Sequence, residues 1–227
     1  MKKYFAIIIA VLGCNLAVAA YGKPYFDPTK ISPTVIAQPF AEGSRDMQQE
    51  IEKIIELQQR ADEKEVKKAI REAKFKAEIL VLATDKNLTK KTHPKLYAFI
   101  NRSLETAAMV SDQAKEYWKM RRPYLVDNRI KALVDPSSSY AYPSGHTIAA
   151  YVTADILDLM MPSTDKSFYR QAEEIAQHRV LAGMHFQRDL NGGRQLEKVI
   201  MKALKENPDF SVDFATAKAE FESKQKK

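Results

Sequence analysis

Residues 46–83, DMQQEIEKIIELQQRADEKEVKKAIREAKFKAEILVLA, contain neither glycine nor proline. Within them, Ile51, Ile54 and Ile55 recur at the spacing that puts side chains on one face of a helix. The alternating acidic and basic residues of the same stretch suit the opposite, solvated face. This stretch therefore predicts one or two long amphipathic helices.

The rest of the chain indicates the same structural class. Only 7 glycines occur in 227 residues, whereas sandwiches, barrels and dinucleotide-binding folds use glycine at their tight turns. No segment shows the alternation typical of half-buried strands. We therefore predict an all-α fold, a single-domain helical bundle. Further helices are expected over residues 95–121, 144–161, 166–181, 191–205 and 212–224.

Composition excludes several classes of protein. A hydrophobic content of 45% with 29% charged residues fits one globular domain, and neither a disordered chain nor a polytopic membrane protein. Four histidines and one cysteine are too few for zinc-finger or zinc-ribbon sites. The net charge of +7 suits an anionic partner. No aromatic-interleaved basic strip is present, so we do not expect nucleic-acid binding.

The first 20 residues have the pattern of a targeting segment. A short basic head precedes an apolar run, and residues 17–19 are the small residues that signal peptidase favours. We predict a signal peptide over residues 1–20 and a periplasmic or secreted protein. The alternatives are an uncleaved anchor, and a lipoprotein acylated at Cys14 that would gain a peripheral membrane contact.

Proline spacing divides the remainder of the chain. Four prolines within residues 21–44 prevent a long regular element there, so we expect a Pro-rich extended arm. Residues 45–222 then form the helical domain, and residues 223–227 form a basic tail. A homo-oligomer is compatible with this organisation.

A first cluster of cations lies near the end of the expected helix 95–121. Lys115 and Arg122 are seven residues apart, which on a continuous helix leaves them about 20° out of line. Lys119 would lie on nearly the same face. Like charges so placed repel one another unless an anion binds against them. The cluster indicates either an anion site or a solvated basic face that ends at Pro123.

A second cluster is Tyr-Pro-Ser-Gly-His-Thr at residues 142–147, directly before an apolar helix. Ser144 can cap that helix, whose free N–H groups make an anion site. Gly145 has no side chain to block a close approach of the anion to the backbone. His146 would stand at the rim and donate a proton. The alternative is an ordinary capped helix with a surface histidine.

The third cluster contains Arg179, His185 and Asp189. His185 and Asp189 are four residues apart, so on one helical turn the carboxylate can accept the ring N–H and direct the other nitrogen outward as a nucleophile. Arg179 falls on another face of an unbroken helix, and Gly183 offers the break that lets Arg179 and His185 converge. The alternative is a structural His–Asp pair beside an unrelated arginine.

In order and spacing, the three clusters resemble the three-part signature of the type 2 phosphatidic acid phosphatase superfamily. Residues 45–222 are similar in particular to bacterial class A non-specific acid phosphatases, which share the vanadium haloperoxidase type of fold. The matching residues are Lys115-x6-Arg122-Pro123, Pro143-Ser144-Gly145-His146 and Arg179-x5-His185-x3-Asp189. One departure is His178, since the family usually has serine immediately before the arginine of the third motif.

The resemblance implies a phosphomonoesterase that uses no metal or other cofactor, acts on small-molecule phosphomonoesters and forms a phosphohistidine. In that mechanism His185 is the nucleophile, Asp189 orients it, and His146 is the general acid and base. The phosphate would be bound by Lys115, Arg122, Ser144, Gly145 and Arg179. An acid pH optimum follows, because His146 must be protonated while His185 is neutral.

Three other functions compete with this interpretation. A lipid phosphate or isoprenyl diphosphate phosphatase belongs to the same superfamily, although such relatives usually carry several membrane spans. The same pocket can hold vanadate, as in a vanadate-dependent haloperoxidase. A non-catalytic phosphate-binding module would result if His178 has abolished turnover. Activity towards a panel of phosphate esters, halide oxidation with vanadate, and phosphate binding without hydrolysis distinguish these functions.

Overall fold

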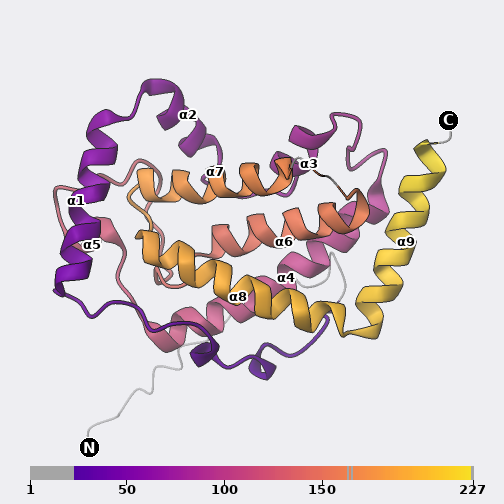
Figure 1. Ribbon diagram of the computed structural model, residues 1–227, viewed down its shortest axis with the longest axis horizontal. Coiled ribbons are helices and arrows are strands. Elements are labelled where there is room, and N and C mark those ends of the chain that lie inside the picture. Colours follow the sequence, from indigo (N-terminus) through magenta and orange to yellow (C-terminus); the bar gives the residue numbers. More distant parts are fainter. Residues whose placement is uncertain (1–22, 163, 165, 226–227) are drawn as a thin grey trace, which may run out of the picture.

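The computed structural model describes residues 23–162, 164 and 166–225, and within this part of the chain the regular structure is entirely helical (Figure 1). The prediction of an all-α fold is confirmed. The expected signal peptide and Cys14 lie outside the described residues. No helix in the described ranges is long and apolar enough to cross a membrane. The elements are η1 (Pro28–Lys30), η2 (Pro33–Val35), α1 (Arg45–Arg60), α2 (Glu63–Arg71), α3 (Glu78–Thr84), α4 (Pro94–Trp118), α5 (Pro123–Val126), α6 (Gly145–Met160), α7 (Ser167–Leu181), α8 (Gln187–Lys205) and α9 (Pro208–Gln225).

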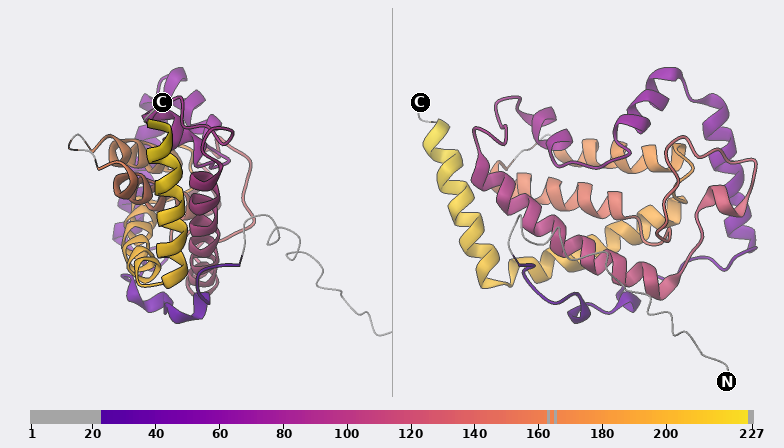
Figure 2. Two further views of the ribbon diagram at one scale, coloured as in Figure 1. Left: turned by 90° about the vertical axis from the view of Figure 1, so that its right-hand side faces the viewer. Right: turned by 180° about the vertical axis from the view of Figure 1, so that it is seen from behind.

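Helix α6 is the centre of the bundle and packs against α4, α7 and α8. It can be surrounded because its sequence is apolar on most faces, and small residues such as Ala150 and Ala154 are fully buried and let neighbouring helices approach. Figure 1 shows α6, α7 and α8 running side by side, and the view from behind in Figure 2 shows α4 across their other face. Helix α9 covers one end of α4.

Residues 45–84 form three helices, α1, α2 and α3, where the sequence predicted one or two. Helix α1 ends because Ala61 adopts an extended conformation, and Asp62 then begins α2 with a capping box closed by Glu65. Residues 72–77, which we call the α2–α3 segment, have no regular helix. Helix propensity alone predicted helices that are too long here, because capping and tertiary contacts interrupt the helical stretch.

The proline-containing residues before α1 lie along the surface of the bundle. The two short turns η1 and η2 both contact α4. Four residues of this segment bury their side chains in the main core, namely Tyr25, Phe26, Ile31 and Ile36. The segment is therefore extended, as its prolines require, but it is packed along much of its length.

The chain reversals of the bundle bring four helix ends together. In Figures 1 and 2, the C-terminal ends of α4 and α7 and the N-terminal ends of α6 and α8 lie on the same side of the molecule. The N-terminal ends offer unpaired N–H groups, and the connecting loops carry the three clusters of the sequence.

Candidate active site

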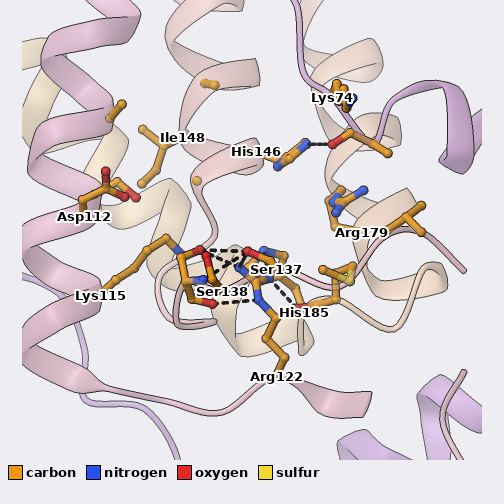
Figure 3. A pocket seen from close by; sticks show the side chains of 18 of the residues that line it. Lys74, Asp112, Lys115, Arg122, Ser137, Ser138, His146, Ile148, Arg179 and His185 are labelled. Atoms are coloured by element: carbon orange, nitrogen blue, oxygen red, sulfur yellow. Dashed lines mark hydrogen bonds between the residues drawn. The ribbon is translucent and has the colours of Figure 1, made fainter. Parts of the chain in front are cut away.

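A cavity of about 520 Å³ opens where these helix ends meet. It is lined by members of all three sequence clusters, although they are separated by up to 70 positions along the chain (Figure 3). The predicted site residues among the lining are Lys115, Arg122, Gly145, His146, Arg179 and His185. Ser144 and Asp189 lie directly behind them and are almost completely buried.

The prediction that Lys115 and Arg122 share one helix face was wrong. Helix α4 ends at Trp118, because Lys119 adopts a left-handed conformation with a φ of 50°. The chain then turns, and Arg122 becomes the residue before α5. The two cations still line the same cavity, but tertiary structure brings them together. Lys119, expected beside them, is exposed and lies outside the lining.

Lys115 is a buried cation whose N–H groups are already used. Its Nζ donates to the carbonyl oxygens of Tyr140 at 2.7 Å, Ala141 at 3.3 Å and Pro143 at 2.7 Å. Burial and the neighbouring Arg122 lower the pKa of Lys115. The three carbonyls favour the charged form, so Lys115 supplies positive charge to the cavity and holds the loop before α6.

Arg122 joins the cavity to a serine-rich loop. Its Nη1 donates to His185 Nε2 at 3.2 Å, and its Nη2 donates to the hydroxyls of Ser137 at 3.2 Å and Ser139 at 3.0 Å. These serines were only a short low-complexity tract in the sequence, and nothing local connects them to Arg122. Their hydroxyl oxygens accept hydrogen bonds where an anionic oxygen could accept them instead.

The second cluster begins α6 as its sequence predicts. Ser144 is the N-cap, and its hydroxyl accepts from Thr147 N at 3.3 Å and from the Thr147 hydroxyl at 3.0 Å. The hydroxyl is therefore engaged within the helix cap. Gly145 lines the cavity, and a Cβ there would lie 3.6 Å from Ser111 Oγ, which is buried and unpaired among the described side chains. Sequence reasoning missed Ser111, which precedes Lys115 by one helical turn.

His146 is half-buried and is held by the α2–α3 segment (Figure 3). Its Nε2 lies 3.1 Å from the carbonyl oxygen of Ala73, which can only accept, so Nε2 carries a proton. The ring also packs edge-on against Phe75, with centroids 6.2 Å apart. Burial, followed by the charge of Arg179, lowers the pKa of His146 to about 3. A bound anion would oppose the effect of the arginine.

Arg179 is a buried cation of the cavity with N–H groups to spare. It lies in the last turn of α7, it is 3% exposed, and its Nε and Nη1 have no partner among the described residues. Burial and the neighbouring Arg122 lower its pKa to about 10. A buried guanidinium with unsatisfied donors is costly unless a ligand accepts from it. The unpaired N–H groups of Arg179 therefore indicate an anion site.

The chain reverses after Arg179 at Gly183, as the sequence predicted. Gly183 has a φ of +71°, and a Cβ there would lie 2.4 Å from the carbonyl oxygen of Lys131. The turn is closed by Met184 N and His185 N, which both donate to the carbonyl oxygen of Arg179. The glycine thereby places His185 back beside Arg179.

His185 and Asp189 are paired, but not on one helical turn as predicted. Helix α8 begins at Gln187, so His185 lies in the preceding loop. The Asp189 carboxylate accepts from His185 Nδ1 at 3.2 Å and from Phe186 N at 3.0 Å. This fixes the tautomer with the lone pair on Nε2. Burial, and then Arg122, lower the pKa of His185 well below 6.5, which keeps the ring neutral. Burial raises the pKa of Asp189.

His178, the residue that departs from the family pattern, is absent from the cavity lining. It is 8% exposed, and its Nδ1 lies 2.6 Å from Glu72 Oε2. No local pattern in the sequence predicts that Glu72 contacts His178 or that Ala73 contacts His146. Within the described ranges, no group of three or more His, Cys, Asp or Glu residues is arranged to hold a metal ion. The cavity thus combines three buried cations with one neutral imidazole nitrogen and a second histidine.

Comparison with known proteins identifies a matching family model and relatives that are named acid phosphatases. Residues 96–196 match the model of the PAP2 superfamily. The non-specific acid phosphatase of Providencia stuartii is 27% identical over 139 residues, which cover 59% of this chain and 56% of that protein. The non-specific acid phosphatase of Salmonella typhi is 29% identical over 115 residues, 49% of this chain and 46% of that protein. The chain spans about half the length of these curated relatives.

A solved structure shares the fold. The crystal structure of a bacterial vanadium-dependent iodoperoxidase superimposes with a TM-score of 0.55 and 15% sequence identity, over 80% of this chain and 52% of that chain. At this identity the likeness concerns the helical architecture alone.

Proposed function

We propose, from the premise that residues 96–196 match the PAP2 superfamily model, that the protein is an acid phosphatase that hydrolyses small-molecule phosphate monoesters. The names of the curated relatives support this reaction class. The observation that carries the proposal is the pairing, within one cavity, of the unpaired N–H groups of Arg179 with the neutral Nε2 of His185. The N–H groups of Arg179 can donate to a phosphoryl oxygen, and the lone pair of His185 Nε2 can act as a nucleophile.

The proposed reaction runs through a phosphohistidine and needs no metal. His185 Nε2 attacks phosphorus and forms a P–N bond while the P–O bond to the alcohol breaks, and His146 gives a proton to the departing oxygen. Water then attacks the phosphorus, its proton passes to His146, and the P–N bond breaks to release phosphate. Asp189 accepts the hydrogen bond from the Nδ1–H group of His185 throughout the reaction.

The cations take different parts in this reaction. Arg179 donates its free N–H groups to the phosphoryl oxygens. Arg122 exchanges its serine partners for these oxygens, and Lys115 contributes charge, because carbonyls occupy its N–H groups. The N–H of Gly145 donates at the start of α6, where the Ser144 cap fixes the backbone. Fixed positive charge of this kind stabilises the transition state of phosphoryl transfer.

Export is the second part of the proposal. The basic head, apolar run and small residues of the first 20 positions support cleavage by signal peptidase and a periplasmic or secreted location. The N-terminal sequence of the protein recovered from cell fractions tests this. A protein retained in the cytosol with residue 1 intact would contradict it.

The decisive experiment is a substrate panel with purified protein in the presence of a metal chelator. We expect phosphate release from nucleotides or sugar phosphates to persist in chelator, and His185→Ala to lower kcat by on the order of 10⁴-fold or more. Acid quench of the wild-type protein should trap an acid-labile phosphoenzyme that His185→Ala does not form. Full activity in His185→Ala, or activity that chelator abolishes, would contradict the mechanism.

The same panel separates the competing functions. Preference for lipid phosphates or isoprenyl diphosphates over soluble esters would indicate the lipid phosphatase alternative. Halide oxidation that depends on added vanadate would indicate a haloperoxidase. Tight binding of phosphate without hydrolysis of any ester would indicate a binding module.

A further inference from the structure

The general acid of the proposed function is held by a segment without regular structure of its own. His146 Nε2 contacts the carbonyl oxygen of Ala73, and its ring contacts Phe75. Both residues belong to the α2–α3 segment. Glu72 N and Ala73 N still donate to carbonyl oxygens in the last turn of α2, so the start of the segment is anchored there. Beyond that turn no helical ladder continues, and side-chain contacts contribute to where the Ala73 carbonyl lies.

The strongest such contact is adjacent to Ala73. Glu72 is 7% exposed and its Oε2 lies 2.6 Å from His178 Nδ1 on α7. A carboxylate only accepts, so Nδ1 carries the proton. Burying a carboxylate is costly unless it is paired, and the interaction is therefore strongly directional. His178 itself directly precedes Arg179, the arginine with free N–H groups in the cavity.

A short covalent path connects this pair with both sides of the cavity. On one side, one peptide unit separates Glu72 from the carbonyl that holds His146. On the other side, one peptide unit separates His178 from Arg179. We propose that Glu72 and His178 are positioning residues, which lock the Ala73 carbonyl onto His146 Nε2 and so hold the general acid in register with the phosphate site.

This role, which rests on the proposed phosphatase function, differs from a general contribution to stability. The Ala73 carbonyl favours the protonated imidazole, since it accepts the Nε2 proton. Loss of the pair would therefore harm the step in which a proton reaches the departing oxygen. The attack by His185 and the binding by Arg179 would be spared, provided that α7 keeps its place in the core.

The test compares kcat/KM for two esters with the same phosphoryl group. Phenyl phosphate has a poor leaving group that needs a proton, whereas 2,4-dinitrophenyl phosphate has a good one that does not. For Glu72→Ala and His178→Ala, we expect kcat/KM to fall by about 10- to 100-fold with phenyl phosphate and by less than about 3-fold with the dinitrophenyl ester. The double variant should lose no more than either single variant.

Conservative variants keep the test valid if the alanine variants fold poorly. Glu72→Gln keeps an acceptor for His178 Nδ1, and His178→Asn keeps a donor near the position of Nδ1, so both should retain most of the phenyl phosphate activity. Lys68→Ala is the matched control, because it removes a neighbouring ion pair between α2 and α7, that of Lys68 with Glu174, and leaves both members of the Glu72–His178 pair in place. It should leave the ratio of the two kcat/KM values unchanged.

The outcomes distinguish failure of the positioning role from failure of the proposed phosphatase function. A wild-type protein that hydrolyses neither ester removes the phosphatase proposal and this inference with it. A wild-type protein that hydrolyses both, with alanine variants that lose both activities equally or neither, leaves the phosphatase standing and overturns the positioning role. The same selective loss in Lys68→Ala would also overturn it, since general docking of α2 would then be the cause.

Discussion

At the scale of single residues, the three buried cations of the cavity are not equivalent. Lys115 and Arg122 already donate to protein oxygens, whereas Nε and Nη1 of Arg179 lack partners among the described residues. The resemblance to the phosphatase family implied all three as phosphate ligands without ranking them. The structure ranks Arg179 first, because its free N–H groups break no existing hydrogen bond when they donate to a phosphoryl oxygen.

Arg179→Ala should therefore weaken phosphate recognition strongly. We expect kcat/KM for p-nitrophenyl phosphate to fall by about 10²-fold and the inhibition constant of inorganic phosphate to rise by at least about 10-fold. Arg129→Ala is the control, because Arg129 is an exposed arginine that pairs with Glu52 and Asp127 and should change either value by less than about 2-fold. Equal effects of the two substitutions would contradict the ranking.

The pH dependence of activity also belongs to this scale. In the free protein, burial and Arg179 lower the pKa of His146 to about 3, so the protonated fraction decreases as pH rises above that value. His185 stays neutral over the same range, since its pKa is also lowered. We expect kcat/KM for phenyl phosphate to fall between about pH 5 and pH 8. His146→Ala should abolish this decline, and a wild-type rate that climbs through the same range would contradict the assignment.

At the scale of elements, close approach of α8 to the loop before α6 unites the second and third clusters. Gly192 in α8 faces Tyr142, and a Cβ there would lie 2.4 Å from Tyr142 Cε2. Tyr142 is 1% exposed and packs edge-on against Trp118, so it has little room to move. Ser144 N donates to the carbonyl oxygen of Asp189 at 2.9 Å across the same contact. The glycine lets two helix ends share one cavity.

Gly192→Ala should damage both stability and activity. Although alanine favours a helix, the clash with Tyr142 should lower the free energy of unfolding by about 1–3 kcal/mol. Urea denaturation measures this loss, and kcat/KM should fall at a temperature where the variant remains folded. Lys198→Ala, at an exposed position of α8, serves as the comparison for a change on the same helix. A more stable and fully active Gly192→Ala protein would show that α8 can retreat.

At the scale of the whole molecule, the N-terminal segment closes the bundle on the side of α4 and α9. The Tyr25 hydroxyl donates to Asp213 on α9 at 2.7 Å, and the Arg102 guanidinium from α4 lies over the Tyr25 ring at 4.1 Å. Asn207 Nδ2 donates to the carbonyl oxygen of Tyr25 at 2.7 Å. Residues up to 188 positions apart are thereby joined at one point.

Tyr25 should consequently stabilise the fold without contributing to the reaction. We expect Tyr25→Ala to cost about 3–5 kcal/mol of unfolding free energy, and Tyr25→Phe, which keeps the ring, to cost about 1 kcal/mol. Since Tyr25 does not line the cavity, kcat/KM of both folded variants should match the wild type. A loss of kcat/KM in Tyr25→Phe at low temperature would show that the segment is coupled to the site.

The sequence by itself determined the helical class, the helix start at Ser144, the break at Gly183 and the residues of three motifs. These features follow from local rules of periodicity, capping and glycine conformation, which act within a few residues. Only the tertiary structure decided that Lys115 and Arg122 meet across a turn, that Arg179 keeps free donors, and that Glu72 pairs with His178. Such contacts depend on how buried helix faces pack together, and no window of sequence contains both partners.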